Sequence, residues 1–263
     1  MLRKLAEAGG VTEHLLTPAG LWRLSSRGAE SRPQLLVIHG LGDSIAGWAQ
    51  ASLPLLTRFR VHLVDLAGHG LSEAPPDWSQ ATLLQGVRAV VQRFPTARLV
   101  GHSLGAWLLL KLILRGELLP RELVLVNPGG ATLPREEWEP FKKLILADSP
   151  AGARAYLRRA FHSPPRALEL FPGEVIRQMR APAISGFLGA VQESDFIAPG
   201  ALASLSIPTR VIWGQSDRLL PVGTLPFWQR ELPRARFVLL DKAGHCPHLE
   251  RPLALARAVA APF

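Results

Sequence analysis

The chain has 263 residues, 48% of them hydrophobic, which is enough for one large α/β domain with a substantial core. Its formal net charge is +9, but the basic residues alternate with acids, as in Arg135-Glu136-Glu137, and form no block of the kind that binds nucleic acid. The single cysteine, Cys246, excludes an internal disulfide and a multi-cysteine metal site.

The lengths of the apolar segments argue against a secreted protein and against a membrane-spanning one. The N-terminal residues MLRKLAEAGG lack the apolar run of a secretory signal, and the longest apolar stretches, 106–110 and 112–114, are too short to cross a bilayer. We therefore expect a cytoplasmic protein that binds no nucleic acid and does not insert into a membrane. The oligomeric state is left open.

Short apolar runs recur along the chain, and each ends at a turn or at a polar residue. Runs that are apolar on both faces are typical of strands buried in a parallel sheet. Amphipathic segments of helical length lie between them, for example 81–94 and 106–115. This alternation predicts an α/β fold with a mostly parallel, doubly wound sheet, an antiparallel edge strand at 21–25, and chemistry at the carboxyl ends of the strands. The expected buried strands are 35–38, 61–64, 98–100, 123–126, 210–213 and 237–240.

Residues 134–200 do not follow this alternation of strands and helices, because they contain helical patterns and prolines but no predicted buried strand. The helical patterns are 136–146, 152–161, 165–171, 174–179 and 183–191. An insertion of this size between two core strands, rich in aromatic residues, predicts a helical lid with an apolar inner face. The expected core domain is then 1–133 together with 201–263. Additional core helices are the alternative.

The strongest chemical signal is Gly101-His102-Ser103-Leu104-Gly105, which follows a predicted strand and precedes a predicted helix. A nucleophilic serine on a sharp strand-to-helix turn needs small neighbours, and the following helix N-terminus favours developing negative charge. Ser103 is therefore the expected nucleophile.

A serine needs a base, and the base needs an acid that orients it. Asp217 comes just after the predicted strand 210–213, and His245 lies in the loop after the next strand. The chain order Ser103, Asp217, His245 is the order used by hydrolases with this kind of turn. The expected oxyanion donors are the backbone N–H groups of Leu104, directly after the nucleophile, and of Leu41 in the glycine-containing loop after strand 35–38.

Five segments of the chain together resemble the α/β-hydrolase superfamily. They are His39-Gly40, the run 65–72, Gly101-x-Ser103-x-Gly105, Gly214-x-x-Asp217 with Pro221, and Gly244-His245. The similarity spans nearly the whole chain and weakens in the N-terminal segment and in 134–200. One departure is Ala67, where the family often has proline.

The resemblance also implies which polar residues take no chemical step. Asp65, His69 and Ser72 are expected to shape the floor of the site, and His39 to support the oxyanion loop. His102 is expected to pack beside the nucleophile, His248 to lie in a loop near the base, and Cys246 to have no redox role.

The family contains several activities, of which ester hydrolysis, C–C bond hydrolysis, amide or aminopeptidase-like cleavage and perhydrolysis stay open for this chain. A serine at residue 103 argues against its dehalogenases and epoxide hydrolases, which use aspartate there. The run 244–252 is similar to carboxylesterases, and 213–218 is similar to C–C bond hydrolases, although those usually have Asn and Trp where this chain has His102 and Cys246.

We therefore expect a serine hydrolase that cleaves esters of small to medium, largely apolar acyl groups through an acyl-enzyme on Ser103. Its partner would be a small-molecule ester, and no cofactor or metal is required. A C–C bond hydrolase acting on dienoic keto acids and a non-catalytic small-ligand receptor on the same fold are the alternatives.

Overall fold

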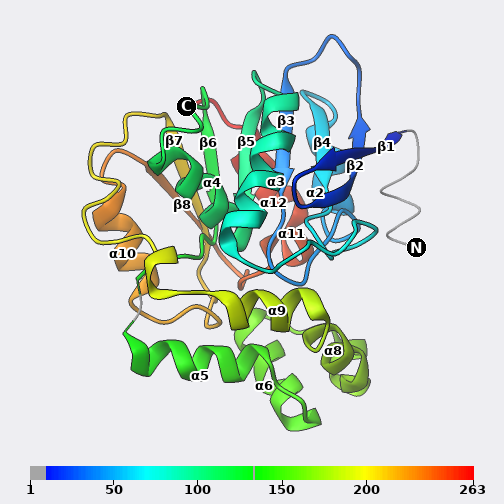
Figure 1. Cartoon of the computed structure of the whole chain (residues 1–263), viewed down its shortest axis with the longest axis vertical. Helices are drawn as coiled ribbons and strands as arrows, with labels where there is room; N and C mark the ends of the chain where they lie inside the picture. The colour runs from blue at the N-terminus through cyan, green and yellow to red at the C-terminus, as the bar shows by residue number, and fades with distance from the viewer. Residues whose placement is uncertain (1–9, 133) are drawn as a thin grey trace.

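The computed structural model describes residues 10–132 and 134–263. Its centre is an eight-stranded sheet in the order β1-β2-β4-β3-β5-β6-β7-β8 (Figure 1). The pairs β1-β2 and β2-β4 are antiparallel, and every later pair is parallel. The predicted mostly parallel, doubly wound α/β fold is confirmed. The strands are β1 (Val11–Thr17), β2 (Gly20–Arg27), β3 (Gln34–Ile38), β4 (Arg60–Val64), β5 (Arg98–His102), β6 (Leu123–Val126), β7 (Thr209–Gly214) and β8 (Arg236–Leu240).

The antiparallel end of the sheet differs from the prediction. The expected edge strand 21–25 lies within β2, which is flanked by β1 and β4 and is therefore not the edge. The edge is β1, most of whose residues are exposed. A strand that faces solvent on both sides has no two-sided apolar run, which is why the apolar pattern did not indicate it.

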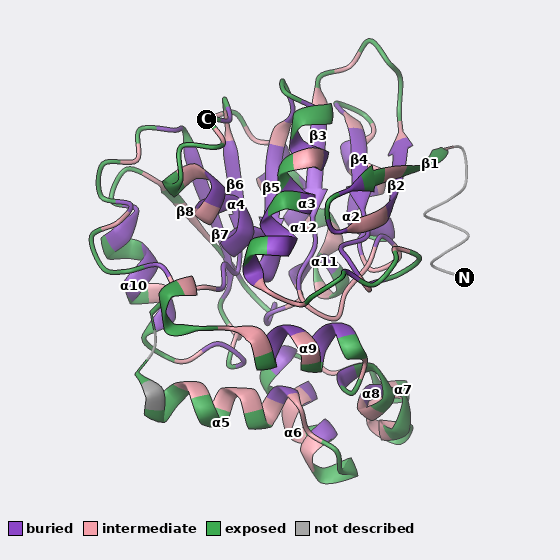
Figure 2. Cartoon of the chain, viewed as in Figure 1, coloured by how far each residue is buried: buried purple, intermediate pink, exposed green. Residues whose placement is uncertain are grey.

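Helices cover both faces of the sheet and divide the core into two clusters. On one face, α2 (Ala49–Leu55) packs against α12 (Pro252–Ala260) and the short α11 (Pro247–Glu250). On the other face, α3 (Gln80–Arg93) packs against α4 (Leu104–Leu114), and α10 (Thr224–Glu231) adds buried aromatic residues. Figure 2 shows the central parallel strands buried between these layers. The loops at the ends of the strands are thereby held on a rigid frame. The strand expected to be buried at 237–240 is only partly buried, because β8 is the other edge of the sheet.

The chain between β6 and β7 is helical, in keeping with the sequence pattern. These helices lie together at one end of the sheet (Figure 1). A single parallel bridge between Ala131 and Ile197 joins the two ends of the segment. The elements are α5 (Arg135–Ile145), α6 (Pro150–Ala160), α7 (Arg166–Leu170), α8 (Pro172–Met179), α9 (Pro182–Ala190) and the 3-10 helix η1 (Glu193–Asp195).

Within residues 10–132 and 134–263, no helix has the length and apolar character needed to cross a membrane.

Candidate active site

Ser103 occupies the turn between β5 and α4 in a strained backbone conformation. Its φ of 49° and ψ of −111° lie outside the regions that residues with a side chain normally adopt. The turn is tight because glycines flank it. A Cβ on Gly105 would lie 2.2 Å from the carbonyl oxygen of Ile38, and a Cβ on Gly101 would lie 2.6 Å from the Cα of Ala106. The backbone therefore accepts only glycine at both positions, and this geometry lifts the Ser103 side chain above the end of the sheet.

The structure brings the three predicted chemical residues together from three separate strand ends. Ser103 Oγ lies 3.0 Å from His245 Nε2, and His245 Nδ1 lies 2.8 Å from Asp217 Oδ2. The side chains of His245 and Asp217 are almost completely buried. An imidazole held in this way can take the hydroxyl proton through one nitrogen while the carboxylate accepts from the other.

Asp217 is held in place by several donors. Its Oδ1 accepts from the backbone N–H groups of Leu219 and Leu220 at 2.9 and 3.2 Å. Its Oδ2 accepts from the side-chain amide of Asn127 at 2.7 Å. Asn127 follows β6 with a left-handed φ of 40°. Asn127 is not among the residues predicted for the site, and the only signal for it in the sequence is the pair Asn127-Pro128 at a strand end.

The loop after β3, which carries Leu41, is fixed by two histidines. His39 donates from Nδ1 to the carbonyl of Gly40 at 2.7 Å, and its Nε2 accepts the N–H of Leu66 at 3.0 Å. His69 Nε2 accepts the N–H of Gly42, also at 3.0 Å. Burial lowers the pKa of His69 to about 4, with a further contribution from His39, so the ring is neutral near pH 7 and can accept this hydrogen bond.

The remaining polar residues of the floor bond to the backbone. Asp65 accepts the N–H groups of Ile45 and Leu71 at 2.7 and 3.1 Å. The hydroxyl of Ser72 donates to the carbonyl of Asp65 at 2.7 Å. Together with the ion pair between Asp65 and Arg23 at 3.5 Å, these contacts tie the loops together.

Two residues beside Ser103 and His245 have surroundings that the sequence did not indicate. His102 packs as predicted, but its Nε2 also donates to the backbone carbonyl of His245 at 2.8 Å. Cys246 lies against the same site, where burial first and then nearby carboxylates raise the pKa of its thiol well above the usual value. A thiol that stays protonated is a poor nucleophile and a poor redox group.

Ser103, His245, Leu41 and Leu104 all face one cavity of about 200 Å³. This volume is below the roughly 300–1,000 Å³ of sites for drug-sized ligands. Neither Lys nor Arg is among the described residues that line the cavity, whose walls are mainly apolar. The wall opposite the sheet comes from the helices between β6 and β7, and includes Trp138, Phe141, Tyr156, Phe161, Val175, Met179, Ile184 and Phe187.

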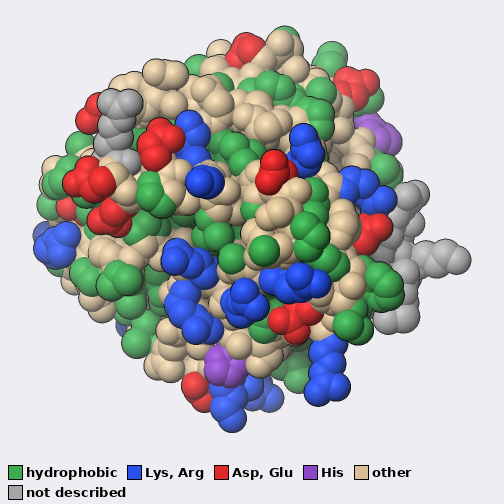
Figure 3. All heavy atoms as spheres, turned by 90° about the horizontal axis from the view of Figure 1, so that it is seen from below, with side chains coloured by type: hydrophobic (Ala, Val, Ile, Leu, Met, Phe, Trp, Pro, Cys, Tyr) green, Lys and Arg blue, Asp and Glu red, His purple; other side chains and the backbone are tan. Residues whose placement is uncertain are grey.

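Basic side chains that are scattered in the sequence gather on the outer surface of these helices. Figure 3 views the molecule from that side, and Lys and Arg side chains lie there around exposed hydrophobic ones. The exposed basic residues of α6 to α8 and the turn after them include Arg154, Arg158, Arg159, Arg166, Arg177 and Arg180. Part of the basic charge of the chain thus lies on the outer surface of the helices that cover the cavity.

Comparison with known proteins is consistent with this architecture. A pimeloyl-[acyl-carrier protein] methyl ester esterase from Nitrosomonas europaea is 30% identical over 235 residues, which cover 84% of this chain and 91% of the relative. The enzyme of the same name from Aeromonas hydrophila is 29% identical over 242 residues, with the same coverage of both chains.

Solved structures share the fold. A putative lipase from Acinetobacter baumannii superposes with a TM-score of 0.79 at 24% identity, covering 97% of this chain and 91% of that one. A 2-hydroxy-6-oxo-6-phenylhexa-2,4-dienoate hydrolase from Rhodococcus has a TM-score of 0.74 at 20% identity, covering 93% and 96%. The family model described as the alpha/beta hydrolase family matches residues 35–258. The chain therefore belongs to the alpha/beta hydrolase family.

Proposed function

We propose that this chain is a serine esterase that cleaves carboxylic esters of small to medium, largely apolar acyl groups through an acyl-enzyme on Ser103. The observation that carries the proposal is the pair of contacts at 3.0 and 2.8 Å that link Ser103, His245 and Asp217 at the base of an apolar cavity. The esterases among its relatives support ester chemistry.

The proposed reaction has two stages. His245 takes the proton of the Ser103 hydroxyl as Oγ attacks the ester carbonyl, and Asp217 stabilises the resulting imidazolium. The backbone N–H groups of Leu41 and Leu104 hold the oxyanion. His245 then gives its proton to the leaving alcohol. Water repeats the sequence on the acyl-enzyme, which releases the acid and restores Ser103.

Residues 134–200 would act as the lid of this site, inserted into a core formed by 1–133 and 201–263. Their apolar inner wall would receive the acyl group and exclude water from the reacting atoms. The wall supports a neutral acyl group, because an anionic group placed there would be buried without a cation.

The lack of a cation in the described cavity wall also favours esters over dienoic keto acids as substrates. A dienoic keto acid brings its own carboxylate, and among the described residues of the cavity wall there is no Lys or Arg to pair with it. We therefore place C–C bond hydrolysis second. A receptor that binds without turnover would need the same cavity but not the strained Ser103 turn.

The test is a panel of p-nitrophenyl esters of graded acyl length together with a dienoic keto acid, assayed with wild type and Ser103→Ala. Ser194→Ala, the same change at an exposed serine of η1, is the control. We expect ester turnover that Ser103→Ala reduces by about 10³-fold or more and that the control retains. A fluorophosphonate adduct should map to Ser103.

Other results would point elsewhere. Cleavage of the keto acid alone would favour the C–C hydrolase, and thermal stabilisation by ligands without any turnover would favour the receptor. A fluorophosphonate adduct on another residue would reject the proposed site.

A further inference from the structure

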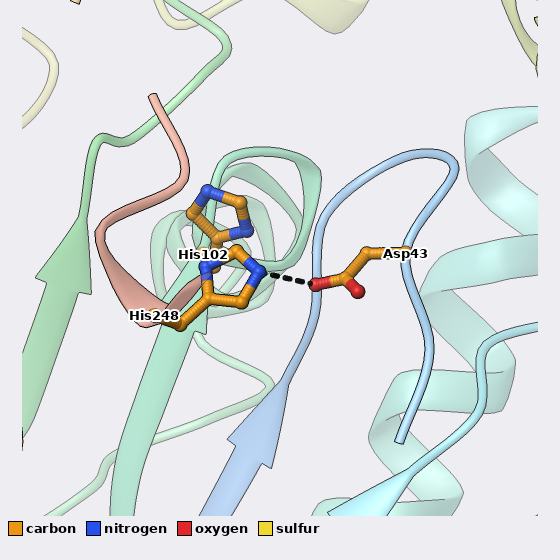
Figure 4. Close-up of side chains that lie close together, drawn as sticks. All are labelled: Asp43, His102 and His248. Atoms are coloured by element: carbon orange, nitrogen blue, oxygen red, sulfur yellow. Dashed lines mark ion pairs between the residues drawn. The ribbon is translucent and has the colours of Figure 1, made fainter. Parts of the chain in front are cut away.

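Three ionisable side chains that the proposed reaction does not use meet beside the triad (Figure 4). Asp43 comes from the loop after β3, His102 ends β5, and His248 lies in α11. One donor atom of each lies within 4.8 Å of the others, and His248 Nε2 lies 3.1 Å from Asp43 Oδ2. His248 is 1% exposed and His102 is 3% exposed. A carboxylate that contacts an imidazole at so buried a position needs an explanation.

The contact joins the two loops that carry opposite halves of the proposed machinery. Asp43 follows Leu41, the proposed oxyanion donor, by two residues, and His248 follows His245 by three. The other carboxylate oxygen of Asp43 accepts the N–H of Ser44 at 2.8 Å, so the side chain is anchored within its own loop. A contact that holds the Asp43 side chain therefore also holds the loop backbone that carries the Leu41 N–H.

Ring packing holds the histidine side of the contact. The ring of His248 stacks on Trp48 at a centroid distance of 4.8 Å and an interplanar angle of 1°. His102 meets the His248 ring edge-on at 4.8 Å and donates its Nε2 proton to the carbonyl of His245. Neither ring can turn without losing these contacts, so the position of His248 relative to His245 is fixed.

Electrostatics keep Asp43 ionised in this position, where its side chain is 16% exposed. Burial alone would raise the pKa of Asp43, but attraction by His248, and more weakly by His39 and His102, outweighs it and holds the pKa well below its usual value. Burial lowers the pKa of His102 well below the usual value, and His248 and His245 lower it further, so His102 is neutral. Of the three rings that attract Asp43, His248 has the largest effect.

We propose that Asp43 and His248 form a positioning pair that clamps the oxyanion loop 40–43 against the loop of His245. The inference rests on the proposed function. The pair acts by holding the Leu41 N–H where the oxyanion develops, so that its loss is felt in the transition state more than in substrate binding.

The same three residues offer another arrangement, a metal site of two histidines and one carboxylate. Asp43 Oδ2, His102 Nδ1 and both ring nitrogens of His248 are buried and meet no described residue in hydrogen-bonding geometry, although His248 Nε2 lies 3.1 Å from Asp43 Oδ2. A zinc ion would need all three ligands at roughly 2.0–2.2 Å. We favour the ion pair, because Asp43 and His248 already approach each other directly at 3.1 Å. Zinc binding is an outcome of the test.

The test is a double-mutant cycle in the full chain, made of Asp43→Asn, His248→Gln and the double variant. Asp77→Asn, at an exposed carboxylate that caps Ser79 and Thr82, and His162→Gln, at an exposed histidine, are the matched controls. For each protein we would measure kcat, KM, the thermal midpoint, and the affinity for a trifluoromethyl ketone, which mimics the tetrahedral oxyanion.

We expect each single variant to lower kcat by about tenfold, a fraction of the roughly 10²–10³-fold that loss of an oxyanion donor costs. KM should change by less than about threefold, and affinity for the ketone should fall in parallel with kcat. The double variant should be no worse than either single variant, because the two residues act as one unit. The controls should match wild type.

Several results would overturn the proposal: unchanged kcat in Asp43→Asn, additive losses in the double variant, or losses confined to KM. So would zinc bound by the chelator-treated wild type at one ion per chain and lost in Asp43→Asn. If His248→Gln does not fold, the nearly isosteric Asp43→Asn decides. A wild type inactive on every ester would contradict the proposed function instead, and is distinguishable because the variants are compared only with an active wild type.

Discussion

At the scale of single residues, the site depends on places where only a hydrogen atom fits. Gly105 is the second residue of α4, and the carbonyl oxygen of Ile38 occupies the space that a side chain would need. Ser103 keeps its positive φ because the tightly packed surroundings hold the backbone of the turn in this conformation. The glycines of the motif thus serve packing between β3 and α4 as well as chemistry.

We predict that Gly105→Ala destabilises the fold severely, by about 3 kcal/mol or more, because a Cβ would meet backbone atoms that cannot move aside. The control is Gly189→Ala in α9, where a Cβ meets nothing within 4 Å. That change should be neutral or stabilising by up to about 1 kcal/mol, the difference in helix propensity. Urea unfolding of both variants checks this; equal stabilities would show that the turn can relax.

The candidate site residues that could be predicted from the sequence are those with local signals. Ser103 stands in a glycine-framed turn, and Asp217 and His245 follow strands, so each could be placed at the carboxyl edge before any contact was known. Asn127 and the pair Asp43–His248 have no such signal. Their partners are distant in the chain and are set by how the loops pack, which a single sequence does not express.

At the scale of elements, the helices and strands with a local sequence pattern were predicted, and features that depend on packing were not. Parallel strands such as β6 and β7 are buried on both faces and therefore read as apolar runs. The edge strand β1 has only its pairing with β2 to define it. The helices α5 to α9 were predicted from their pattern, but the cavity wall that they form depends on their packing over the sheet.

One of these helices offers a test of acyl selectivity. Trp138 of α5 lines the cavity, stacks on Phe141 at 5.3 Å and meets Phe196 edge-on at 4.9 Å. We predict that Trp138→Ala raises KM for a p-nitrophenyl octanoate by about fourfold, what one buried methylene group contributes, and leaves the acetate unaffected. Glu139→Ala, at the next and exposed residue of α5, is the control. Equal changes for acetate and octanoate would contradict a lid that contacts the acyl chain.

At the scale of the whole molecule, the fold buries titratable groups that stay neutral. His62 of β4 lies under Phe94 at a ring distance of 4.0 Å and bonds through Nδ1 to the hydroxyl of Ser26 at 2.8 Å. Burial, and then the charges of Arg60 and Arg93, lower the pKa of His62 from 6.5 to about 4. His69 has a pKa lowered to about 4 by burial as well. Protonation of either ring therefore destabilises the folded state.

The sign of the effect follows from proton binding. Between pH 6.5 and about 4 the unfolded chain holds a proton on His62 that the folded chain does not, so acidification favours unfolding. Each such histidine costs up to about 1.4 kcal/mol per pH unit within this window and nothing above it. We predict that the free energy of unfolding is flat with respect to His62 above pH 7 and falls between pH 6.5 and 4.5.

Replacement of His62 should remove the part of the pH dependence of the unfolding free energy that this residue causes. His62→Gln keeps a polar group beside Ser26 but cannot be protonated, so the variant should lose less stability than wild type on going from pH 7.5 to pH 5, by about 1 to 2 kcal/mol. His162→Gln, the same change at an exposed site, controls for the substitution itself. Urea unfolding at several pH values measures the difference. Parallel pH curves for wild type and His62→Gln would mean that the buried ring accepts a proton in the folded state as readily as in the unfolded chain.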